Sequence, residues 1–343
     1  MTDAQLLEHL RRCPFVLAPM AGITDRPFRS FMRELGCGIV VTELVSATGF
    51  KFSPAKTRKL MEFDSEQHPV GIQLFGDNLE HLAETARAVQ DMGADFVDLN
   101  FGCPVPKVVN KGAGSACLKD LNRLAQVIRS VKSAVTIPVT IKIRTGWDHD
   151  TRNSPEVVRV AADEGVTWVA IHGRTRAAAY TGLADWEYIR EVRRQSPLPI
   201  LGNGDIRSAE MAVERLRASS CEGVMIGRGC LKNPRIFSEA LAAWQCDDSL
   251  ATAARALPLE KILARLCEHL EGFYDERLTL IQMRKFAAWY SAGFPGAAGF
   301  RRDLFQLQGR GEVLGRIQDF FAGLNGMTQS DTSQEPFLMG GHG

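Results

Sequence analysis

The sequence predicts an α/β fold, a (β/α)8 TIM barrel followed by a small C-terminal α-helical bundle. Short apolar runs alternate with amphipathic segments through the first two-thirds of the chain. The runs are apolar on both faces, as in parallel strands covered by helices. Eight such repeats over roughly 230 residues suit a barrel of the usual ~250 residues. Polar residues follow nearly every run, which favours a barrel over a doubly wound open sheet with one switch point.

The elements follow from the periodicity of apolar residues. Strands are expected at eight runs: 15–18, 39–42, 70–74, 96–99, 139–143, 168–171, 199–202 and 223–226. Helices are expected between them, over 26–35, 56–62, 79–92, 121–131, 155–164, 186–194 and 208–218, with a closing helix at 234–244.

Composition changes after the barrel pattern ends, so residues 1–245 are assigned to the barrel domain. Residues 246–257, which contain Asp247, Asp248, Ser249 and an alanine-rich run, are interpreted as a linker. Pro258 suits the first position of a helix, and helices are expected over 259–274, 278–290, 300–309 and 312–324. They form a predicted bundle over 258–327. The Gly/Ser/Thr-rich tail 328–343 is expected to be disordered.

Bulk composition is that of an ordinary globular protein, with 343 residues, 45% hydrophobic and 24% charged. The net charge of +1 neither supports nor excludes a nucleic-acid partner, which would need a local basic face. The eight cysteines form no CxxC pair and no zinc-like spacing, which predicts free thiols in a reducing cytoplasm and no metal site. The run 13–21 is too short, and too broken by proline, for a membrane span or a signal sequence.

Cys103 follows the fourth expected strand on a tight turn. Gly102 and Pro104 prevent regular structure there, and barrel enzymes keep reactive groups just past strand ends. A free cysteine is more often one buried apolar residue among others, so the interpretation depends on its neighbours. Polar or unusual residues follow all eight strands and would meet at one mouth: Pro19-Met20, Glu43, Gln73, Asn100 with Cys103, Lys142 with Arg144, His172, Asn203 with Asp205, and Gly227-Arg228.

Two glycine-containing loops predict a phosphorylated cofactor. Segments 202–205 (Gly-Asn-Gly-Asp) and 226–229 (Ile-Gly-Arg-Gly) follow strands seven and eight, where barrels often hold a phosphate on backbone N–H groups. No GxGxxG dinucleotide pattern is present. Lys142 would place a positive charge beside a developing anion. FMN satisfies both features, with its phosphate beneath the last loops, its ring near Lys142 and Gln73 at the ring edge.

The chemistry of Cys103 follows from its acidity. An unperturbed thiol, with a pKa of ~8.5, is mostly protonated near neutrality and can act as an acid. When hydride adds to one carbon of a conjugated double bond, the neighbouring carbon needs a proton. A flavin on one face and a thiol on the other would supply both. A nucleophilic cysteine is the alternative, although no histidine lies close in sequence to serve as its base.

These residues resemble the tRNA-dihydrouridine synthase family from Pro14 to Arg302, and most closely its bacterial B-type members. The motifs that carry the resemblance are, in chain order, APMAGITDRPFR at 18–29, NFGCP at 100–104 with Lys107-Val108, GAGSA at 112–116, KIRTGW at 142–147, HGRTR at 172–176, GNGDI at 202–206 and MIGR at 225–228.

The resemblance implies a flavoenzyme that reduces the C5–C6 bond of a D-loop uridine in tRNA. NADPH would reduce FMN, hydride would reach C6, and Cys103 would protonate C5. The implied uracil contacts are Asn100, Arg144 and Tyr180, and the base must leave its stack to lie on a flavin. No membrane contact and a monomer are expected. The implied FMN contacts are Pro19, Met20, Gln73, Lys142, His172, Asn203, Asp205, Gly227 and Arg228.

The helical segment corresponds to the family's tRNA-docking domain. Arg284 and Lys285 are the expected phosphate contacts, together with Arg301, Arg302 and Arg310; Phe286 stands where the family often has histidine. Two alternatives stay open. An FMN barrel acting on a free pyrimidine, like the dihydroorotate and dihydropyrimidine dehydrogenases, would need no helical domain. A non-catalytic RNA-binding protein on the same scaffold would not need Cys103, Lys142 and His172.

Overall fold

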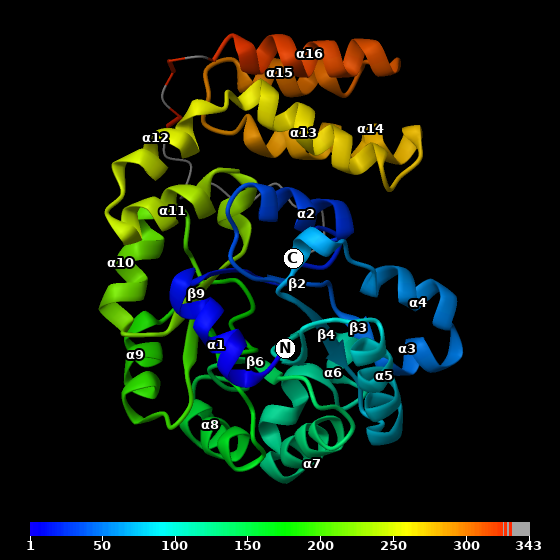
Figure 1. The fold of residues 1–343 in the computed structure, drawn as a ribbon, viewed down its shortest axis with the longest axis vertical. Helices are drawn as coiled ribbons and strands as arrows, with labels where there is room; N and C mark the ends of the chain where they lie inside the picture. Colours follow the sequence, from blue (N-terminus) through cyan, green and yellow to red (C-terminus); the bar gives the residue numbers. More distant parts are fainter. Residues whose placement is uncertain (325, 328, 331–343) are drawn as a thin grey trace.

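A computed structural model describes residues 1–324, 326–327 and 329–330 and shows a barrel with a helical region beside it (Figure 1). The strands are β1 (Phe15–Leu17), β2 (Val40–Val41), β3 (Val45–Ser46), β4 (Val70–Phe75), β5 (Phe96–Phe101), β6 (Val139–Arg144), β7 (Val169–His172), β8 (Ile200–Asn203) and β9 (Gly223–Ile226). All pairs are parallel, in the order β1-β9-β8-β7-β6-β5-β4-β2, and β3 pairs with the end of β4.

The two ends of this sheet meet and close the barrel. Val16 and Ile39 form a parallel bridge, and the Leu17 N–H donates to the Ile39 carbonyl at 2.9 Å. The eight expected strands are confirmed, and the open-sheet alternative is wrong because β1 finds a partner on both sides. Strand β3 was not expected; it has only two residues, too few for a periodic pattern.

Helices cover the outside of the barrel, and most begin at a side-chain cap. They are α2 (Arg26–Glu34), α3 (Ala47–Phe52), α4 (Pro54–Met61), α5 (Leu79–Asp91), α6 (Pro106–Val109), α7 (Leu121–Lys132), α8 (Ser154–Asp163), α9 (Trp186–Gln195), α10 (Ala209–Ser219) and α11 (Ile236–Gln245). The preceding Asp, Asn or Ser accepts the N–H three residues on, which fixes each helix start, at Asp25, Asn78, Asp120, Asp185 and Ser208.

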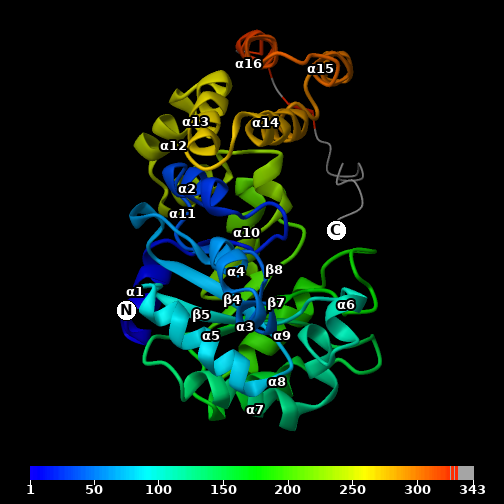
Figure 2. The same ribbon diagram turned by 90° about the vertical axis from the view of Figure 1, so that its right-hand side faces the viewer.

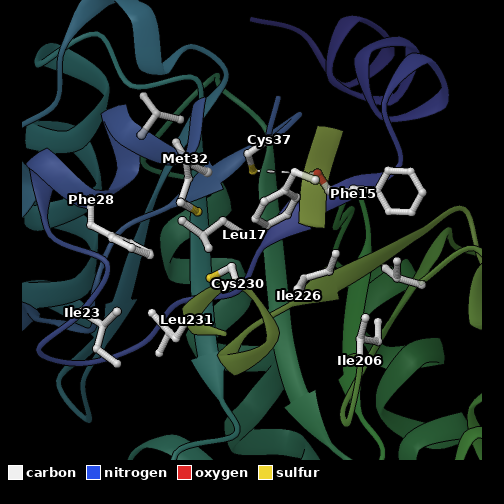
Figure 3. Close-up of a cluster of buried hydrophobic side chains, with 14 of the residues drawn as sticks. Phe15, Leu17, Ile23, Phe28, Met32, Cys37, Ile206, Ile226, Cys230 and Leu231 are labelled. Atoms are coloured by element: carbon white, nitrogen blue, oxygen red, sulfur yellow. Dashed lines mark hydrogen bonds between the residues drawn. The ribbon is translucent and has the colours of Figure 1, made fainter. Parts of the chain in front are cut away.

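Strands that are apolar on both faces serve two cores. Val16 faces the barrel interior, whereas its neighbours Phe15 and Leu17 face outward. Figure 3 shows Phe15 and Leu17 in the outer layer with Phe28 of α2 and the residues after β9. A further helix, α1 (Asp3–Arg12), was not expected. It buries Leu6 and Leu10 in the interior core.

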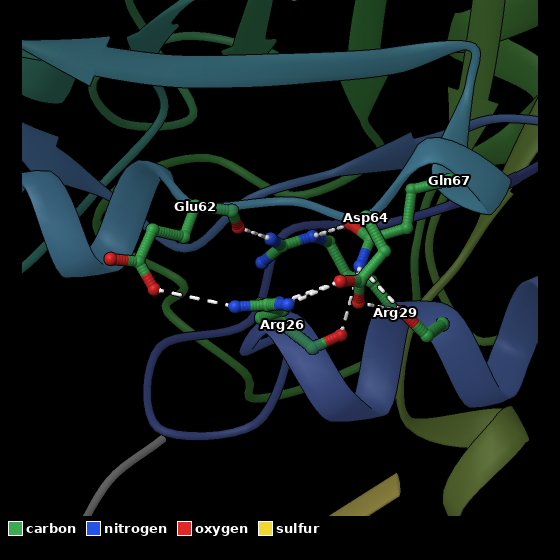
Figure 4. Close-up of polar contacts among 6 residues, drawn as sticks. Arg26, Arg29, Glu62, Asp64 and Gln67 are labelled. Atoms are coloured by element: carbon green, nitrogen blue, oxygen red, sulfur yellow. Dashed lines mark hydrogen bonds and ion pairs between the residues drawn. The ribbon is translucent and has the colours of Figure 1, made fainter. Parts of the chain in front are cut away.

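A polar network fixes α2 and the loop that leads into it. The guanidinium of Arg29, which is buried, donates to the Gln67 Oε1 at 2.9 Å and to the carbonyls of Thr24 and Glu62 at 2.6 and 2.5 Å. Arg26 pairs with Asp64 on the same side (Figure 4). Because Thr24 ends the loop after β1, this network also holds that loop at the barrel mouth.

The helical region comprises α12 (Asp248–Ala256), α13 (Leu259–Glu271), α14 (Glu276–Tyr290), α15 (Ala297–Leu304) and α16 (Arg310–Ala322). The segment expected as a linker is therefore mostly helix α12, none of whose residues is buried. Asp247 caps this helix, which explains why a polar stretch is helical. Pro258 is the N-cap of α13 and not its first residue.

The helical region packs on α2, as both views of the ribbon show (Figure 2). Phe286 of α14 is 1% exposed and stacks on Phe28 with ring centroids 5.1 Å apart. Glu34 of α2 pairs with Arg265 and His269 of α13, both at 2.8 Å. The helical region and the barrel thus share a packed contact along α2, from Phe28 near its start to Glu34 at its end.

Two residues of the tail expected to be disordered are held in place. Ser330 donates its N–H to the Gly293 carbonyl at 2.9 Å, and Gln329 donates its Nε2 to the Ala292 carbonyl at 2.6 Å. The rest of the expected disordered tail, residues 328 and 331–343, lies outside the described residues. Among the residues described, no helix is long and apolar enough to cross a membrane.

Candidate active site

Lys142, His172 and Asn203 lie at one end of the barrel, on three strands. The register pairs Arg144 with His172 and His172 with Asn203, so the carboxyl ends of β6, β7 and β8 stand level. The Lys142 Nζ donates to the Asn203 Oδ1 at 3.0 Å, and the Asn203 Nδ2 donates to the Met225 carbonyl at 2.8 Å. Residues distant in sequence therefore form one cluster at the mouth.

Gln73 and Asn100 connect this mouth to the turn that carries Cys103. The Asn100 Nδ2 donates to the Gln73 Oε1 at 2.9 Å, while its Oδ1 accepts the N–H groups of Gly102 and Cys103 at 3.1 and 2.8 Å. Ser115 adds a hydroxyl hydrogen bond to the Cys103 carbonyl at 2.8 Å. The turn is thus held from both sides.

The thiol of Cys103 is half-buried, and burial raises its pKa above the ordinary 9.0. The Val105 N–H and the charge of Arg144 act against this shift. The thiol is therefore protonated near neutral pH, which suits an acid better than a nucleophile.

Burial and neighbouring positive charges together set the protonation of Lys142 and His172. The pKa of Lys142 falls from 10.5 to about 8, first because the ammonium is buried and then because Arg144 is near; Asp98 opposes the fall. Burial lowers the pKa of His172 well below 6.5, and the neighbouring Lys142 lowers it further. His172 is therefore a neutral imidazole at neutral pH.

Tyr180 reaches the mouth although its loop after β7 is long. Its ring is 44% exposed and lies 6.4 Å from the His172 ring. The guanidinium of Arg228 stands 4.9 Å from the ring centroid and that of Arg144 stands 5.5 Å from it. Arg144 also ties this loop to the Cys103 turn, because it donates to the carbonyls of Gly102, Thr175 and Ala179.

Asp205 is at the mouth, but its carboxylate is already engaged. Both oxygens accept from the Arg174 Nη2, at 2.9 and 2.8 Å, and the Ala184 N–H donates to one of them at 2.7 Å. Gly204 before it has φ +130°, and a Cβ there would stand 2.5 Å from the Ala184 Cβ. Only glycine allows this close passage beside His172.

The loops after β1 and β9 complete the mouth. A Cβ on Gly227 would have the Met20 sulfur as its nearest neighbour, at 3.6 Å, and the Met20 N–H donates to Thr24 Oγ1 at 3.0 Å. Pro19 precedes Met20 in this loop. Arg228 makes no ion pair within the described residues, so its charge is free to meet an anion.

Two site residues were missed by the sequence reasoning. Arg174 lies within the HGRTR motif and was quoted there without a role; it is buried and pairs with Asp205. Asp98 interrupts the apolar run 96–99 and is fully buried between Gln73 and Thr140. A carboxylate inside a strand that is otherwise apolar on both faces was the signal that could have identified it.

The cations expected to meet RNA phosphates mostly have partners inside the protein. The Arg284 Nη2 donates to the Leu307 carbonyl at 2.7 Å, and the Lys285 Nζ donates to the Gly22 carbonyl at 3.2 Å. Lys285 thereby lies against the loop after β1, whereas Arg284 lies within the helices. Of the other three, Arg301 contacts Ser291, Arg302 contacts Asp303 and Arg310 contacts Glu271.

Among the described residues, no group of three or more His, Cys, Asp or Glu side chains is arranged to hold a metal ion. All eight cysteines are free.

Comparison with solved structures supports the fold. The chain resembles a 2-naphthoyl-CoA reductase with a TM-score of 0.53 and 11% identity, covering 67% of this chain and 50% of that one. It resembles the histamine dehydrogenase of Rhizobium sp. 4-9 with a TM-score of 0.52 and 13% identity, covering 75% and 49%. The chain thus spans about half the length of these structures, and at such identities the likeness shows the barrel alone.

Comparison of sequences is more specific. The chain is 40% identical over 312 residues to tRNA-dihydrouridine synthase B of Pseudomonas aeruginosa, covering 90% of this chain and 92% of the relative. It is 36% identical over 312 residues to a probable tRNA-dihydrouridine synthase of Rickettsia bellii, covering 89% and 94%. The profile of the dihydrouridine synthase (Dus) family matches residues 16–324. The chain belongs to the dihydrouridine synthase family.

Proposed function

We propose that this protein reduces the C5–C6 double bond of a D-loop uridine in tRNA, using FMN as cofactor and NADPH as electron donor. The names of its relatives support the reaction. The observation that carries the proposal is the pairing, at one mouth, of a protonated thiol on Cys103 with a half-buried ammonium on Lys142. The two are linked through neighbouring strands, since Asn100 stands in register with Lys142 and holds the Cys103 turn.

The charge of the mouth fits FMN. Four cations, Lys142, Arg144, Arg174 and Arg228, lie close enough to His172 to lower its pKa, so an anionic group bound among them would lower the energy of the site. Asp98 and Asp205 offset part of this positive charge. Gly227 leaves room beside its backbone, since the nearest atom to a Cβ there would be the Met20 sulfur at 3.6 Å. The residues proposed to hold FMN are Pro19, Met20, Gln73, Lys142, His172, Asn203, Asp205, Gly227 and Arg228.

The chain's own chemistry is a proton transfer. FMN held by the residues named above and reduced by NADPH would supply the hydride for C6 of the uracil. Cys103 then gives its thiol proton to C5, so one hydride and one proton saturate the bond, and the thiolate recovers a proton from solvent. Burial favours this role, because it raises the pKa of the thiol and so keeps the proton on sulfur until C5 of the uracil accepts it.

Three residues are proposed to hold the uracil: Asn100, Arg144 and Tyr180. The Nε and Nη1 of Arg144 are occupied by backbone carbonyls, which leaves its Nη2 for a uracil carbonyl. Tyr180 offers an exposed ring beside His172. A base can use these contacts only after leaving its stack in the tRNA.

The helical domain, residues 258–327, is proposed to dock the tRNA on the catalytic barrel domain, residues 1–245. Its packing on α2 sets the domain beside the mouth. Arg284 and Lys285 each donate one hydrogen bond to a carbonyl, and their remaining N–H groups are proposed to contact phosphates. We further propose that the protein acts as a monomer in the cytoplasm.

The direct test uses purified protein, NADPH and unmodified tRNA. We expect a yellow protein with flavin absorbance, and formation of dihydrouridine measured by mass spectrometry of digested tRNA. A chain ending at residue 245 should retain flavin but lose most activity on tRNA. Reduction of free uracil or orotate at a rate matching that on tRNA would favour a free-pyrimidine reductase. A colourless protein without reductase activity would favour a non-catalytic RNA-binding protein.

A further inference from the structure

A chain of hydrogen bonds runs from the buried Asp98 to the turn of Cys103. The register places Gln73, Asp98 and Thr140 level on β4, β5 and β6. The Gln73 Nε2 donates to Asp98 Oδ2 at 2.6 Å, and the Thr140 hydroxyl donates to Asp98 Oδ1 at 2.6 Å. Gln73 then accepts from Asn100, which in turn accepts the two N–H groups of the turn.

The direction of these bonds depends on the carboxylate. An amide has one donor end and one acceptor end of almost the same shape, so Gln73 and Asn100 each have two possible orientations. Asp98 accepts a hydrogen bond from Gln73, so the NH2 of Gln73 must face it and its carbonyl must face Asn100. The NH2 of Asn100 must then face Gln73, and its carbonyl must face the N–H groups of Gly102 and Cys103.

We propose that Asp98 is a positioning residue: it sets the orientation of Gln73 and Asn100, and through them holds the turn that carries Cys103. The proposal deepens the proposed function, because Gln73 and Asn100 also face the cofactor and the uracil in that scheme. One buried carboxylate thus determines which polar atoms the mouth presents and where the thiol stands.

Burial explains why the orientation is strict. Asp98 is 0% exposed and Gln73 is 1% exposed, so no water replaces a partner lost from either side chain. If Gln73 were reversed, its carbonyl would face a carboxylate oxygen and its NH2 would face the NH2 of Asn100. Both contacts oppose like partial charges in a medium of low dielectric constant.

The test measures the reactivity of Cys103 in the full-length protein without substrate. Iodoacetamide is added, and alkylation at each cysteine is followed by peptide mass spectrometry, with the exposed Cys246 as internal reference. Asp98→Asn is expected to raise the rate at Cys103 relative to Cys246 by about fivefold, the effect of one lost hydrogen bond on an opening equilibrium. Thr140→Val is the matched control. It removes the other donor to Asp98 but leaves Gln73 and Asn100 oriented, so the ratio should stay unchanged.

A double-mutant cycle separates positioning from packing. Gln73→Met interrupts the chain of hydrogen bonds, so it should raise the ratio alone, and Asp98→Asn added to it should change nothing further. The Gln73→Met measurement still decides the matter if Asp98→Asn does not fold. Three results would overturn the proposal. Asp98→Asn could change the Cys103/Cys246 alkylation ratio equally with and without Gln73→Met, Thr140→Val could change it as much as Asp98→Asn does, or Gln73→Met could leave it unchanged. These readouts need no turnover, so failure to form dihydrouridine would refute the proposed function and leave this result standing.

Discussion

The barrel mouth and the helical region differ in how their positive charges are neutralised. At the mouth, Arg228 makes no ion pair among the described residues, and the ammonium of Lys142 is half-buried with Asn203 as its hydrogen-bond acceptor. In the helical region, two of the five cations that the sequence marked for RNA pair with carboxylates, Arg302 with Asp303 and Arg310 with Glu271. The other three donate to neutral carbonyl or hydroxyl oxygens. The mouth thus holds partly buried cations without a carboxylate partner, whereas Arg302 and Arg310 of the helical region are exposed and paired.

The difference shows that basic residues are not all equally good evidence for a bound anion. A buried, poorly compensated cation is costly, and it persists when a ligand supplies the missing charge. An exposed arginine beside a glutamate costs little and indicates little about a partner. We therefore expect substitutions at the mouth to have large effects and substitutions among the paired arginines to have small ones.

The largest effect is expected for Cys103→Ala. The thiol is the proposed proton donor, and general acids contribute about 10²–10⁴ to a rate. Formation of dihydrouridine should fall by about that factor, while the flavin content stays that of the unaltered protein, because no proposed cofactor contact is removed. Cys246→Ala, at an exposed cysteine, is the control and should keep full activity. Turnover of Cys103→Ala within a few-fold of the control would contradict the role.

The next effect compares a buried ion pair with an exposed one. Asp205→Asn leaves the guanidinium of Arg174, whose side chain is 3% exposed, without its carboxylate. The free energy of unfolding should fall by about 3 kcal/mol, as for other broken buried pairs. Glu271→Gln disrupts the pair with Arg310, whose side chain is 50% exposed, and should leave the free energy of unfolding almost unchanged. Urea unfolding of both variants checks the comparison, and equal losses would contradict it.

How far the sequence predicts these regions depends on the range of the forces involved. Strand ends were predictable, because parallel strands of a closed barrel must bring Lys142, His172 and Asn203 to the same rim. Helix α12 and strand β3 were missed, since a cap at Asp247 and a two-residue pairing leave no periodic pattern. The partners of Arg284 and Lys285 depend on the packing of distant segments, which residue types along the chain do not reveal.

The next prediction concerns the protonation of Lys142 and the pH dependence of stability. Its pKa is about 8 when folded, against an ordinary 10.5, so between these values the unfolded chain holds a proton that the folded chain lacks. The contribution of Lys142 to stability therefore rises with pH across this window, by about 1.4 kcal/mol per unit at most. Lys142→Met should abolish that rise, measured as the difference in unfolding free energy between pH 7.5 and 9.5 for protein stripped of flavin. The same pH dependence in both proteins would show that folding does not lower the pKa of Lys142, which would contradict the prediction.

The smallest effect concerns the helical face itself. Arg277 on α14 is exposed and makes no hydrogen bond or ion pair within the described residues, and exposed Leu278 and Ile281 lie near it. If tRNA lies along α14, Arg277→Ala removes one phosphate contact. The slope of log Kd for tRNA against log salt concentration should then fall by about 1. Arg310→Ala should leave the slope unchanged, because Glu271 already neutralises that charge. A larger change for Arg310→Ala would mean that RNA displaces Glu271, and the contrast between mouth and helical face would then hold only for the free protein.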